Sequence, residues 1–567
     1  MGGICGYVGT GDPAWLPAML AAIGYRGDQT DLRSGPGFGI GVRGRGPARV
    51  HDTADGGWLA CAGGTTTAAT EAAIDLERRL AAKDFSDLDG AFAAARWHPD
   101  GALTLLRDPF GVRSLYYVTH GRALLFASEL KQLLAVPDLP CDLDLAAIHK
   151  YLTFSFVPGE AVPVRGVRRL LPGHLLHWQD GTHTVTPWFA LEESVPPGVV
   201  DEKAAARDVF QLGQAAVQRR LQAGPQGVYL SGGLDSSAVA LWLQRAGADV
   251  RAFSLDFGDK SVEREHAEEV ARVLGLPLQW VPMTGAELPH LLTDLVRWLD
   301  LPFGDTVTAP QLLLGRAARA AGLRQVWNGE GGDQLFGGWT QKPMLAAAVY
   351  GDEDEEPEAQ YLRSYHRFYG LEDELYTPEF HAAVGTPGQR RALLRPYLAD
   401  PDVPGFLGRV RRADLALKGS QNILPRAERI AAGLGLDVQM PFLDRLLAEA
   451  SFRMPPSLKL HGACEKYVLK LALAKHLPKD IVWRRKFGMN APATDWLLGP
   501  LQPVLDDALG EASVKRRGLF RPEYIARLRA GHDQPLETRR RRIGEKLWAL
   551  LMVELWLRAF VDRRGRP

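Results

Sequence analysis

A seven-residue run, Ser231-Gly232-Gly233-Leu234-Asp235-Ser236-Ser237, has the composition of an anion-binding loop. An apolar stretch precedes it and an amphipathic helical pattern follows it, so its backbone N–H groups and the helix N-terminus converge on one point. The serines add hydroxyl donors, and Asp235 can hold a Mg²⁺ ion that bridges phosphates. No lysine follows the glycines, so the run is not a GxxxxGK[ST] loop. The plainer alternative is a strand-to-helix turn capped by Ser and Asp.

A second acidic loop follows residues 325–327 (QVW) and reads NGEGGDQLFGGW over residues 328–339. Its glycines allow Glu330 and Asp333, three residues apart, to be directed at one site without bulky neighbours. One carboxylate could serve a metal ion and the other could accept a proton. The alternative interpretation is a polar surface loop.

These two loops need elements that bring them together. Residues 228–283 alternate buried-type strands with helical patterns, which predicts a doubly wound parallel sheet and hence an α/β fold. The first ~190 residues read as short strands with two helical patterns, at 13–25 and 69–83, and predict sheets flanked by helices. Pro196-Pro197-Gly198 predicts a linker. Helical patterns dominate beyond residue 339.

The composition excludes several classes of protein. The 567 residues contain 46% hydrophobic and 24% charged residues, with Lys+Arg and Asp+Glu equal at 67 each, which predicts no nucleic-acid or membrane-surface partner. The four cysteines show neither a disulfide framework nor a zinc pattern, so we expect a reducing, cytoplasmic compartment. Neither a signal peptide nor an apolar run of membrane-spanning length is present.

The motifs resemble those of known enzymes. SGGLDSS is similar to the pyrophosphatase loop of N-type ATP pyrophosphatases, and GEGGDQLFGGW to the GEGxDE(L/V)FGGY segment of asparagine synthetases. PFLD at 441–444, EKYVLK at 465–470 and LPKDIVWRRKFGMNAP at 477–492 follow in that family's order. RDPFGVRSLYY (107–117), FASELKQLL (126–134) and the opening MGGICGYVG resemble its class II glutamine amidotransferase half, so the resemblance covers nearly the whole chain.

The resemblance implies a degenerate amidotransferase-like domain over residues 1–193, with an N-terminal nucleophile-type αββα sandwich. It also implies an ATP-dependent amide synthetase domain over 202–567 with a helical C-terminal part. In the synthetase domain, Asp235 and Asp333 would share Mg²⁺ with the ATP phosphates, Lys466 would stabilise charge on the reacting phosphorus, and Glu330 would deprotonate the attacking amine. The remaining residues assigned to ATP and pyrophosphate are Ser231, Gly232, Gly233, Ser236, Ser237, Leu255 and Gly329.

The amidotransferase chemistry, by contrast, is expected to be lost. In that class an N-terminal cysteine exposed at position 2 hydrolyses glutamine, and this chain has Gly2 there. Cys5 could act only after a further cleavage, and cysteine at that position is otherwise a packing residue. Tyr25-Arg26-Gly27-Asp28 replaces HRGPD, and CAGGTTTAA at 61–69 replaces the segment NGEIYN. We therefore expect a scaffold without glutaminase activity.

The acceptor side also departs from asparagine synthetases. Where the family reads approximately DRxSMAHSIEVRVPFLD, residues 428–440 read ERIAAGLGLDVQM before PFLD, and Gln439 replaces an arginine. A pocket built to pair the charges of a small amino acid would lose polar contacts by such changes. Free aspartate is therefore a doubtful substrate.

An enzyme that activates a carboxylate but has lost its ammonia source should take its amine from the substrate. Two offshoots of the family do so, the β-lactam synthetases and the lasso-peptide macrolactam cyclases. Glu330 stands where β-lactam synthetases typically place tyrosine, so the sequence favours a lasso-type cyclase acting on a peptide or small molecule with both a carboxylate and an amine. A leader peptidase and a leader-binding protein would then be partners. An ammonia-dependent asparagine synthetase, a β-lactam or other small-molecule amide synthetase, and a catalytically inactive relative are the alternatives.

Overall fold

A computed structural model of the chain describes residues 2–46, 48–66, 72–194, 201–258, 261, 263–338, 356–364, 367–384, 388–403, 405–484, 491–531 and 537–562. These residues form a mixed α/β fold of two compact units. One unit comprises Met1–Asp144, Gly159–Leu191 and Gly419–Asp437, and the other comprises Leu145–Pro158, Glu192–Lys418 and Val438–Pro567. These units are discontinuous in sequence, and the boundaries 1–193 and 202–567 stay a prediction. The predicted linker at 196–198 lies outside the described residues.

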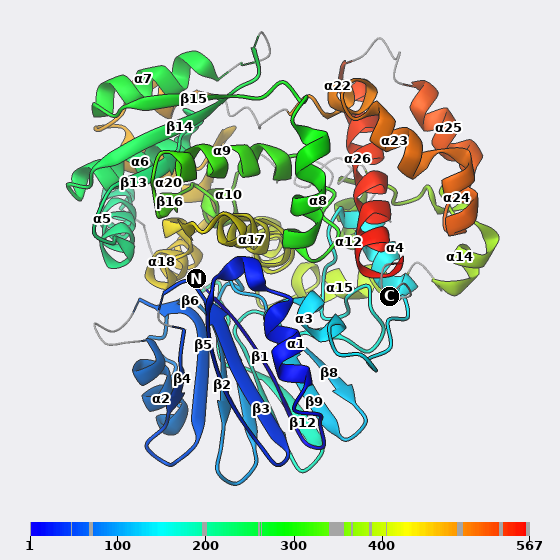
Figure 1. Cartoon of the computed structure of the whole chain (residues 1–567). Coiled ribbons are helices and arrows are strands. Elements are labelled where there is room, and N and C mark those ends of the chain that lie inside the picture. Colours follow the sequence, from blue (N-terminus) through cyan, green and yellow to red (C-terminus); the bar gives the residue numbers. More distant parts are fainter. Residues whose placement is uncertain are drawn as a thin grey trace. The chain divides into compact units, whose positions relative to one another are not determined.

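Two six-stranded antiparallel sheets form the first unit (Figure 1). One has the order β10-β8-β9-β1-β3-β2, with β1 Gly2–Val8, β2 Gln29–Gly35, β3 Phe38–Gly44, β8 Tyr116–His120, β9 Ala123–Ala127 and β10 Arg168–Arg169. The other has the order β12-β11-β7-β6-β5-β4, with β4 Val50–Asp52, β5 Trp58–Thr65, β6 Gly90–Trp97, β7 Leu103–Arg107, β11 His174–Gln179 and β12 Thr182–Pro187.

The core of this unit lies between the two sheets. Ile4 and Phe126 of the first sheet and Ala93 and Leu105 of the second belong to one buried cluster. Helix α2 (Ala72–Ala82) packs on the outer face of the second sheet, where its Leu76 joins a second buried cluster. The first sheet is covered by α1 (Trp15–Ala21), which also contacts α3 (Leu130–Leu134). The predicted helices at 13–25 and 69–83 contain α1 and α2, although α1 ends at Ala21 and residues 69–71 lie outside the described residues. Strands with flanking helices are confirmed for this half.

Gly2, the position at which the resemblance expects a nucleophile, lies in β1. Gly2 pairs with Gly44 of β3, and a Cβ atom added to Gly2 would lie 2.9 Å from the carbonyl oxygen of Arg43. Cys5, in the middle of the same strand, is 0% exposed, and burial raises the pKa of its thiol well above the usual range. A buried, protonated thiol is a weak nucleophile. Cys5 therefore has the surroundings of a packing residue.

A buried ion cluster joins helix α17 (Leu424–Leu434) to the 3-10 helix Gly24–Arg26 and to residues 113–116 of the first unit. Glu428 is 4% exposed and accepts hydrogen bonds from Arg26 Nη1 and Nη2 at 2.7 and 3.2 Å and from Arg113 Nη1. Arg429 of the same helix donates to the hydroxyls of Ser114 and Tyr116 at 3.1 and 2.6 Å. Burial alone would raise the pKa of Glu428, but the two arginines outweigh it and hold the pKa below its usual range.

The second unit is built on a five-stranded sheet of order β15-β14-β13-β16-β17 (Figure 1). Its strands are β13 Gln226–Tyr229, β14 Val250–Asp256, β15 Leu278–Pro282, β16 Gln325–Trp327 and β17 Asp437–Gln439, and β13 pairs in parallel with both β14 and β16. The sheet is contacted by helices α6 Leu234–Arg245, α7 Arg264–Leu274 and α9 Thr308–Ala320. Helix α5 Glu202–Arg220 packs on α6, and α8 Leu288–Leu299 packs on α9. The parallel sheet with alternating helices confirms the prediction for residues 228–283.

Helices dominate the described residues beyond α10 (Gly332–Phe336), as predicted. They are α12 Pro357–Ser364, α13 Glu372–Leu375, α14 Pro378–Ala383, α15 Gly388–Leu398, α16 Phe406–Ala413, the π-helix Asp414–Ile423, α18 Arg445–Arg453, α19 Pro456–Lys459, α20 Tyr467–Leu473, α21 Lys479–Val482, α22 Ala493–Leu498, α23 Gln502–Leu509, α24 Glu511–Arg517, α25 Pro522–Ala530 and α26 Glu537–Phe560, with α4 Leu145–Phe154 from earlier in the chain. A short hairpin of β18 (Leu460–His461) and β19 (Cys464–Glu465) precedes α20. Among the described helices, none has both the length and the apolar composition needed to cross a bilayer.

Removing the carboxylate of Glu428 should destabilise the first unit. Glu428→Ala leaves two buried guanidinium groups without this partner, which costs about 3–5 kcal/mol, because the loss of one partner exposes the desolvation penalty of the other. The measurement is the midpoint of urea denaturation of the full chain. Glu160→Ala, which removes the exposed ion pair with Arg168, is the matched control, with an expected cost of about 0–1 kcal/mol.

The same ion cluster predicts a pH dependence. Since the pKa of Glu428 is lower in the fold than in the unfolded chain, its stabilising effect is present above the ordinary carboxyl pKa of 4.5 and is lost as the pH falls through the folded value. The stability gap between wild type and Glu428→Gln should therefore be full at neutral pH and shrink in acid. A gap that stays constant down to low pH would contradict this assignment.

Candidate active site

The loops after β13 and β16 lie at one edge of the parallel sheet. The chain passes from β13 outward through β14 and β15 and then returns to place β16 on the opposite side of β13. Ligands of such sheets bind at this point of reversal, beyond the carboxyl ends of the strands. This order is what brings the SGGLDSS loop and the GEGGD loop together.

The SGGLDSS loop is held in shape by its own side chains. Ser236 Oγ accepts a hydrogen bond from the backbone N–H of Ser231 at 3.2 Å, and Ser231 Oγ accepts from the N–H of Gly233 at 3.2 Å. Gly232 has a left-handed φ of +70°, and a Cβ atom there would lie 2.5 Å from the backbone nitrogen of Ala267. Helix α6 begins directly after this turn. Its N-cap residue is Gly233, which has no side chain to cap the N-terminus of the helix. The first turn of α6 is therefore available to an anion.

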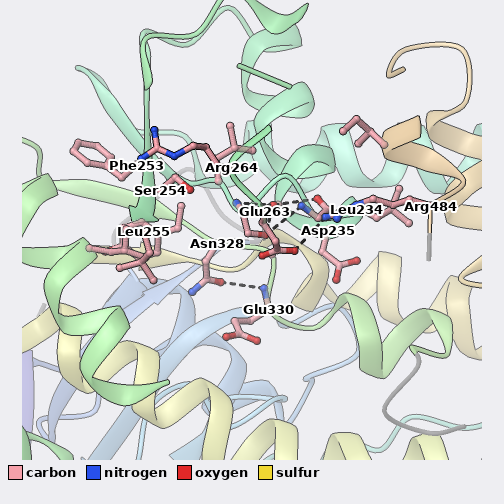
Figure 2. A pocket seen from close by; sticks show the side chains of 18 of the residues that line it. Leu234, Asp235, Phe253, Ser254, Leu255, Glu263, Arg264, Asn328, Glu330 and Arg484 are labelled. Atoms are coloured by element: carbon pink, nitrogen blue, oxygen red, sulfur yellow. Dashed lines mark hydrogen bonds and ion pairs between the residues drawn. The ribbon is translucent and has the colours of Figure 1, made fainter. Parts of the chain in front are cut away.

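The GEGGD loop is anchored to the neighbouring strand. The backbone N–H of Asn328 donates to Gln439 of β17 at 3.1 Å, and Asn328 Oδ1 accepts from the backbone N–H of Glu330 at 3.2 Å (Figure 2). Gly331 has a φ of +100°, which turns the chain into α10. A Cβ atom on Gly332 would lie 2.5 Å from Asp235 Oδ1, so a side chain at this position would contact the carboxylate of the other loop.

Lys466 joins the two loops. Its Nζ lies 2.6 Å from Asp235 Oδ1 and 2.6 Å from Asp333 Oδ1, and its side chain is 2% exposed. The residue precedes α20 and has a φ of +53°, a left-handed conformation that a residue with a side chain adopts at a cost of about 1–3 kcal/mol. One buried ammonium thus lies between two carboxylates, one at the start of α6 and the other at the start of α10.

A cavity of about 280 Å³ opens beside this group. Of the predicted site residues it is lined by Ser231, Gly233, Asp235, Ser236, Leu255, Gly329, Glu330 and Lys466. Figure 2 shows Phe253 and Leu255 at one end of the cavity and Asp235 and Arg484 at the other. Arg264 lies beside Phe253 in the same view, so charged side chains are present at both ends.

Three predicted residues do not line the cavity. Gly232 contacts the start of α7, Asp333 is paired with Lys466, and Ser237 is 0% exposed in α6. Within the described part of the chain, Ser237 Oγ has no hydrogen-bond partner.

Sequence reasoning missed several charged residues of the cavity wall. Arg484 donates from Nη2 to the carbonyl oxygen of Gly232 at 3.0 Å and lies 3.2 Å from Glu263 Oε1. Lys470 lies 3.9 Å from Glu465 Oε1, and Arg264 lies over the ring of Trp280 at 4.5 Å. Lys470 could have been found, because it is one helical turn after Lys466 and shares its face. The sequence holds no local signal for Arg484 or Arg264.

ATP and Mg²⁺ fit this set of groups. Arg484 Nη1 is buried and, among the residues described, has no hydrogen-bond partner, so it can donate to a phosphate oxygen without losing another bond. No cluster of three metal-ligating side chains occurs in the described ranges. Mg²⁺ commonly binds through one or two carboxylates, with phosphate and water oxygens supplying the other ligands. Asp235 and Asp333 can supply that pair.

Comparison with known proteins places the chain in a family. Residues 208–558, more than half of the chain, match the family model of asparagine synthase, and residues 63–189 match the glutamine amidotransferase domain. The chain belongs to the asparagine synthase family and is an ATP-dependent ligase.

The relatives include proteins from bacteria and fungi. Asparagine synthetase [glutamine-hydrolyzing] 1 of Bacillus subtilis is 23% identical over 88% of this chain and 82% of its own length. Asparagine synthetase [glutamine-hydrolyzing] 3 of the same organism is 28% identical over 70% of this chain and 67% of its own. Amidase chry2 of Gibberella zeae is 26% identical over 79% of this chain and 76% of its own.

The contact between Gly332 and Asp235 can be tested directly. Gly332→Ala should turn the Asp235 carboxylate away from Lys466 and lower ATP-dependent pyrophosphate release by roughly 10²-fold, the cost of displacing one charged group of a preorganised site. The fold should persist, because the displaced atom ends a side chain. Gly64→Ala, where a Cβ atom meets nothing within 4 Å, is the control. Unchanged pyrophosphate release in Gly332→Ala would contradict the close approach of the two loops.

Proposed function

We propose that this chain activates a carboxylate as its acyl-adenylate and joins it to an amine carried by the substrate, as a lasso-peptide macrolactam cyclase does. The observation that supports it most is the grouping of Asp235, Asp333, Lys466 and Glu330 at the edge of the parallel sheet. Adenylyl transfer needs positioning and charge neutralisation more than covalent help from the protein. A pair of carboxylates and a buried lysine supply both.

The proposed reaction has two steps. In the first, a carboxylate oxygen of the substrate attacks the α-phosphorus of ATP, and pyrophosphate leaves. In the second, the amine nitrogen attacks the acyl carbon, the bond to AMP breaks, and a proton moves from the nitrogen. Bound Mg²⁺ would neutralise phosphate charge in the first step.

The chain's own residues have separate tasks in these steps. The first turn of α6, with Ser231 and Ser236, would bind phosphate oxygens, and Lys466 would stabilise negative charge at the reacting phosphorus. Leu255 and Gly329 would contact the nucleotide. Glu330 lines the same cavity and would accept the proton of the amine.

Three observations support a reaction without glutamine hydrolysis. Gly2 occupies the position of the nucleophile, Cys5 is buried, and the amidotransferase match begins at residue 63, after β1. We propose that the first unit keeps the N-terminal nucleophile-type αββα sandwich as a scaffold. Residues 1–193 would form this domain and residues 202–567 the synthetase domain.

The substrate of such an enzyme carries both reacting groups. We propose a peptide whose N-terminal amine is joined to an Asp or Glu side chain, with a leader peptidase and a leader-binding protein as partners in the cytoplasm. The carbonyl oxygen of Gln439, where asparagine synthetases have arginine, accepts a hydrogen bond from the backbone N–H of Asn328. The uncharged side chain of Gln439 offers a free amino acid no charged partner at this position. A small molecule that carries both a carboxylate and an amine would be the alternative substrate.

A second candidate is ammonia-dependent asparagine formation. It is favoured by the names of the relatives from Bacillus subtilis and by Glu330, which stands in the asparagine synthetase pattern. β-Lactam formation has less support, since those enzymes typically place tyrosine at this position.

One experiment separates these functions. The full chain is incubated with ATP, Mg²⁺ and either aspartate or a synthetic peptide with an N-terminal glycine and an internal Asp or Glu, and pyrophosphate and amide products are measured. Isotope-labelled glutamine and ammonium report the origin of the nitrogen. We expect pyrophosphate release and peptide cyclisation without label.

Single substitutions test the role proposed for each residue. Lys466→Ala and Asp235→Ala should abolish pyrophosphate release, whereas Glu330→Gln should lower amide formation by roughly 10²-fold and spare adenylation, as expected for loss of a general base. Labelled nitrogen from glutamine in the product would overturn the proposal. Labelled asparagine from ammonium would support the second candidate instead.

A further inference from the structure

The carboxylate of Glu330 has a partner on helix α9. Gln311 lines the cavity and donates a hydrogen bond from Nε2 to Glu330 Oε1 at 3.1 Å. The backbone of Glu330 is held separately, through its N–H bond to Asn328. The loop residue is therefore fixed both at its main chain and at the end of its side chain.

Gln311 lies on helix α9, and the packing of this helix fixes the position of the contact. Leu314, three residues after Gln311, is 5% exposed and lines the same cavity, so one face of α9 forms this part of the wall. The helix packs against β14 and β15 of the parallel sheet. A group placed on such an element is held more accurately than one on a loop.

The loop itself gives Glu330 little stiffness. Its neighbours are Gly329 and Gly331, and fixing a free glutamate side chain costs about 1.5–2 kcal/mol of conformational entropy. A hydrogen bond made before the substrate arrives meets part of that cost in advance. The carboxylate is then already oriented when the acyl-adenylate forms.

The partner is also chemically suited to a base. A cation in contact with a carboxylate lowers its pKa by about 1–3 units and makes it a weaker proton acceptor. A carboxamide orients the same oxygen through a hydrogen bond and adds no charge. Gln311 therefore fixes the geometry of Glu330 with a smaller loss of basicity than a lysine or arginine at that place.

We propose that Gln311 is a positioning residue for amide formation, which rests on the proposed role of Glu330 as the base. In the second step the nitrogen–carbon bond forms, the bond from the acyl carbon to the AMP oxygen breaks, and the proton of the nitrogen passes to Glu330. Gln311 holds the carboxylate during this transfer and exchanges no proton. Its contribution falls on the second step alone.

The test measures the two steps separately in the full chain with ATP, Mg²⁺ and the synthetic peptide. Hydroxylamine captures the acyl-adenylate as a hydroxamate and so reports adenylation without the natural amine. Gln311→Met keeps the length of the side chain and removes the donor. We expect adenylation within about twofold of wild type, an unchanged KM for ATP, and amide formation lowered about tenfold or more, a part of the effect of a general base.

One variant serves as a control, and a second replaces Gln311→Met if that variant does not fold. Arg316→Gln changes an exposed residue of the same helix, paired at 3.8 Å with Asp294, and should alter neither step. If Gln311→Met does not fold, Gln311→Asn decides, since it keeps the amide and withdraws it by one methylene. It should show the same selective loss of amide formation.

The outcomes separate this inference from the proposed function. If Glu330→Gln lowers amide formation selectively and the Gln311 variant does not, the role of Gln311 is wrong and that of Glu330 stands. If the Gln311 variant lowers both steps equally, the residue is structural and the inference is overturned. If Glu330→Gln itself lowers both steps equally, the base assignment fails, and the inference fails with it.

Discussion

The ammonium of Lys466 between Asp235 and Asp333 is the interaction on which the site depends. Two carboxylates close together repel each other, and burial strengthens that repulsion because the local dielectric is low. A cation between them removes this cost and holds the loops after β13 and β16 at a fixed separation. The left-handed backbone of Lys466 is strained, so the surrounding contacts must determine its position.

The first unit shows the same constraint with the charges reversed. There Glu428 neutralises Arg26 and Arg113, and the pairing holds helix α17 to the segments of the first unit that carry these arginines. A carboxylate with two arginine partners is stable in a buried site only if it stays ionised, which its lowered pKa ensures at neutral pH. Retention of this packing without the nucleophile fits a unit that supports structure and not glutamine chemistry.

The proposed function follows from combining the two units. An acyl-adenylate hydrolyses unless an amine reaches it first, so the proposed loss of glutamine hydrolysis would require another way to deliver nitrogen. An amine attached to the same substrate as the carboxylate has an effective concentration that reaches about 10⁵–10⁸ M when the geometry is good. Macrocyclisation would therefore suit an enzyme of this family without an ammonia supply of its own. In the proposed reaction, a positioned Glu330 accepts the proton of the attacking amine.

The sequence alone was enough to find the two loops and the class of the fold, and the chemistry of the loops stays a prediction. Strand, glycine pair and helix follow one another at SGGLDSS, and GEGGD is equally local, so both patterns and the parallel sheet could be predicted from neighbouring residues. Lys466 was assigned only by resemblance, because a single lysine before a helix carries no local signal.

The tertiary structure decided which side chains meet. Lys466 and Asp235 are 231 residues apart, and only the strand order and the path of the chain after β17 place them in contact. The same applies to Arg484 on Gly232, to Gln311 on Glu330, and to the place of residues 419–437 in the first unit. Such contacts depend on how whole elements pack, and the types and spacing of nearby residues do not contain that information.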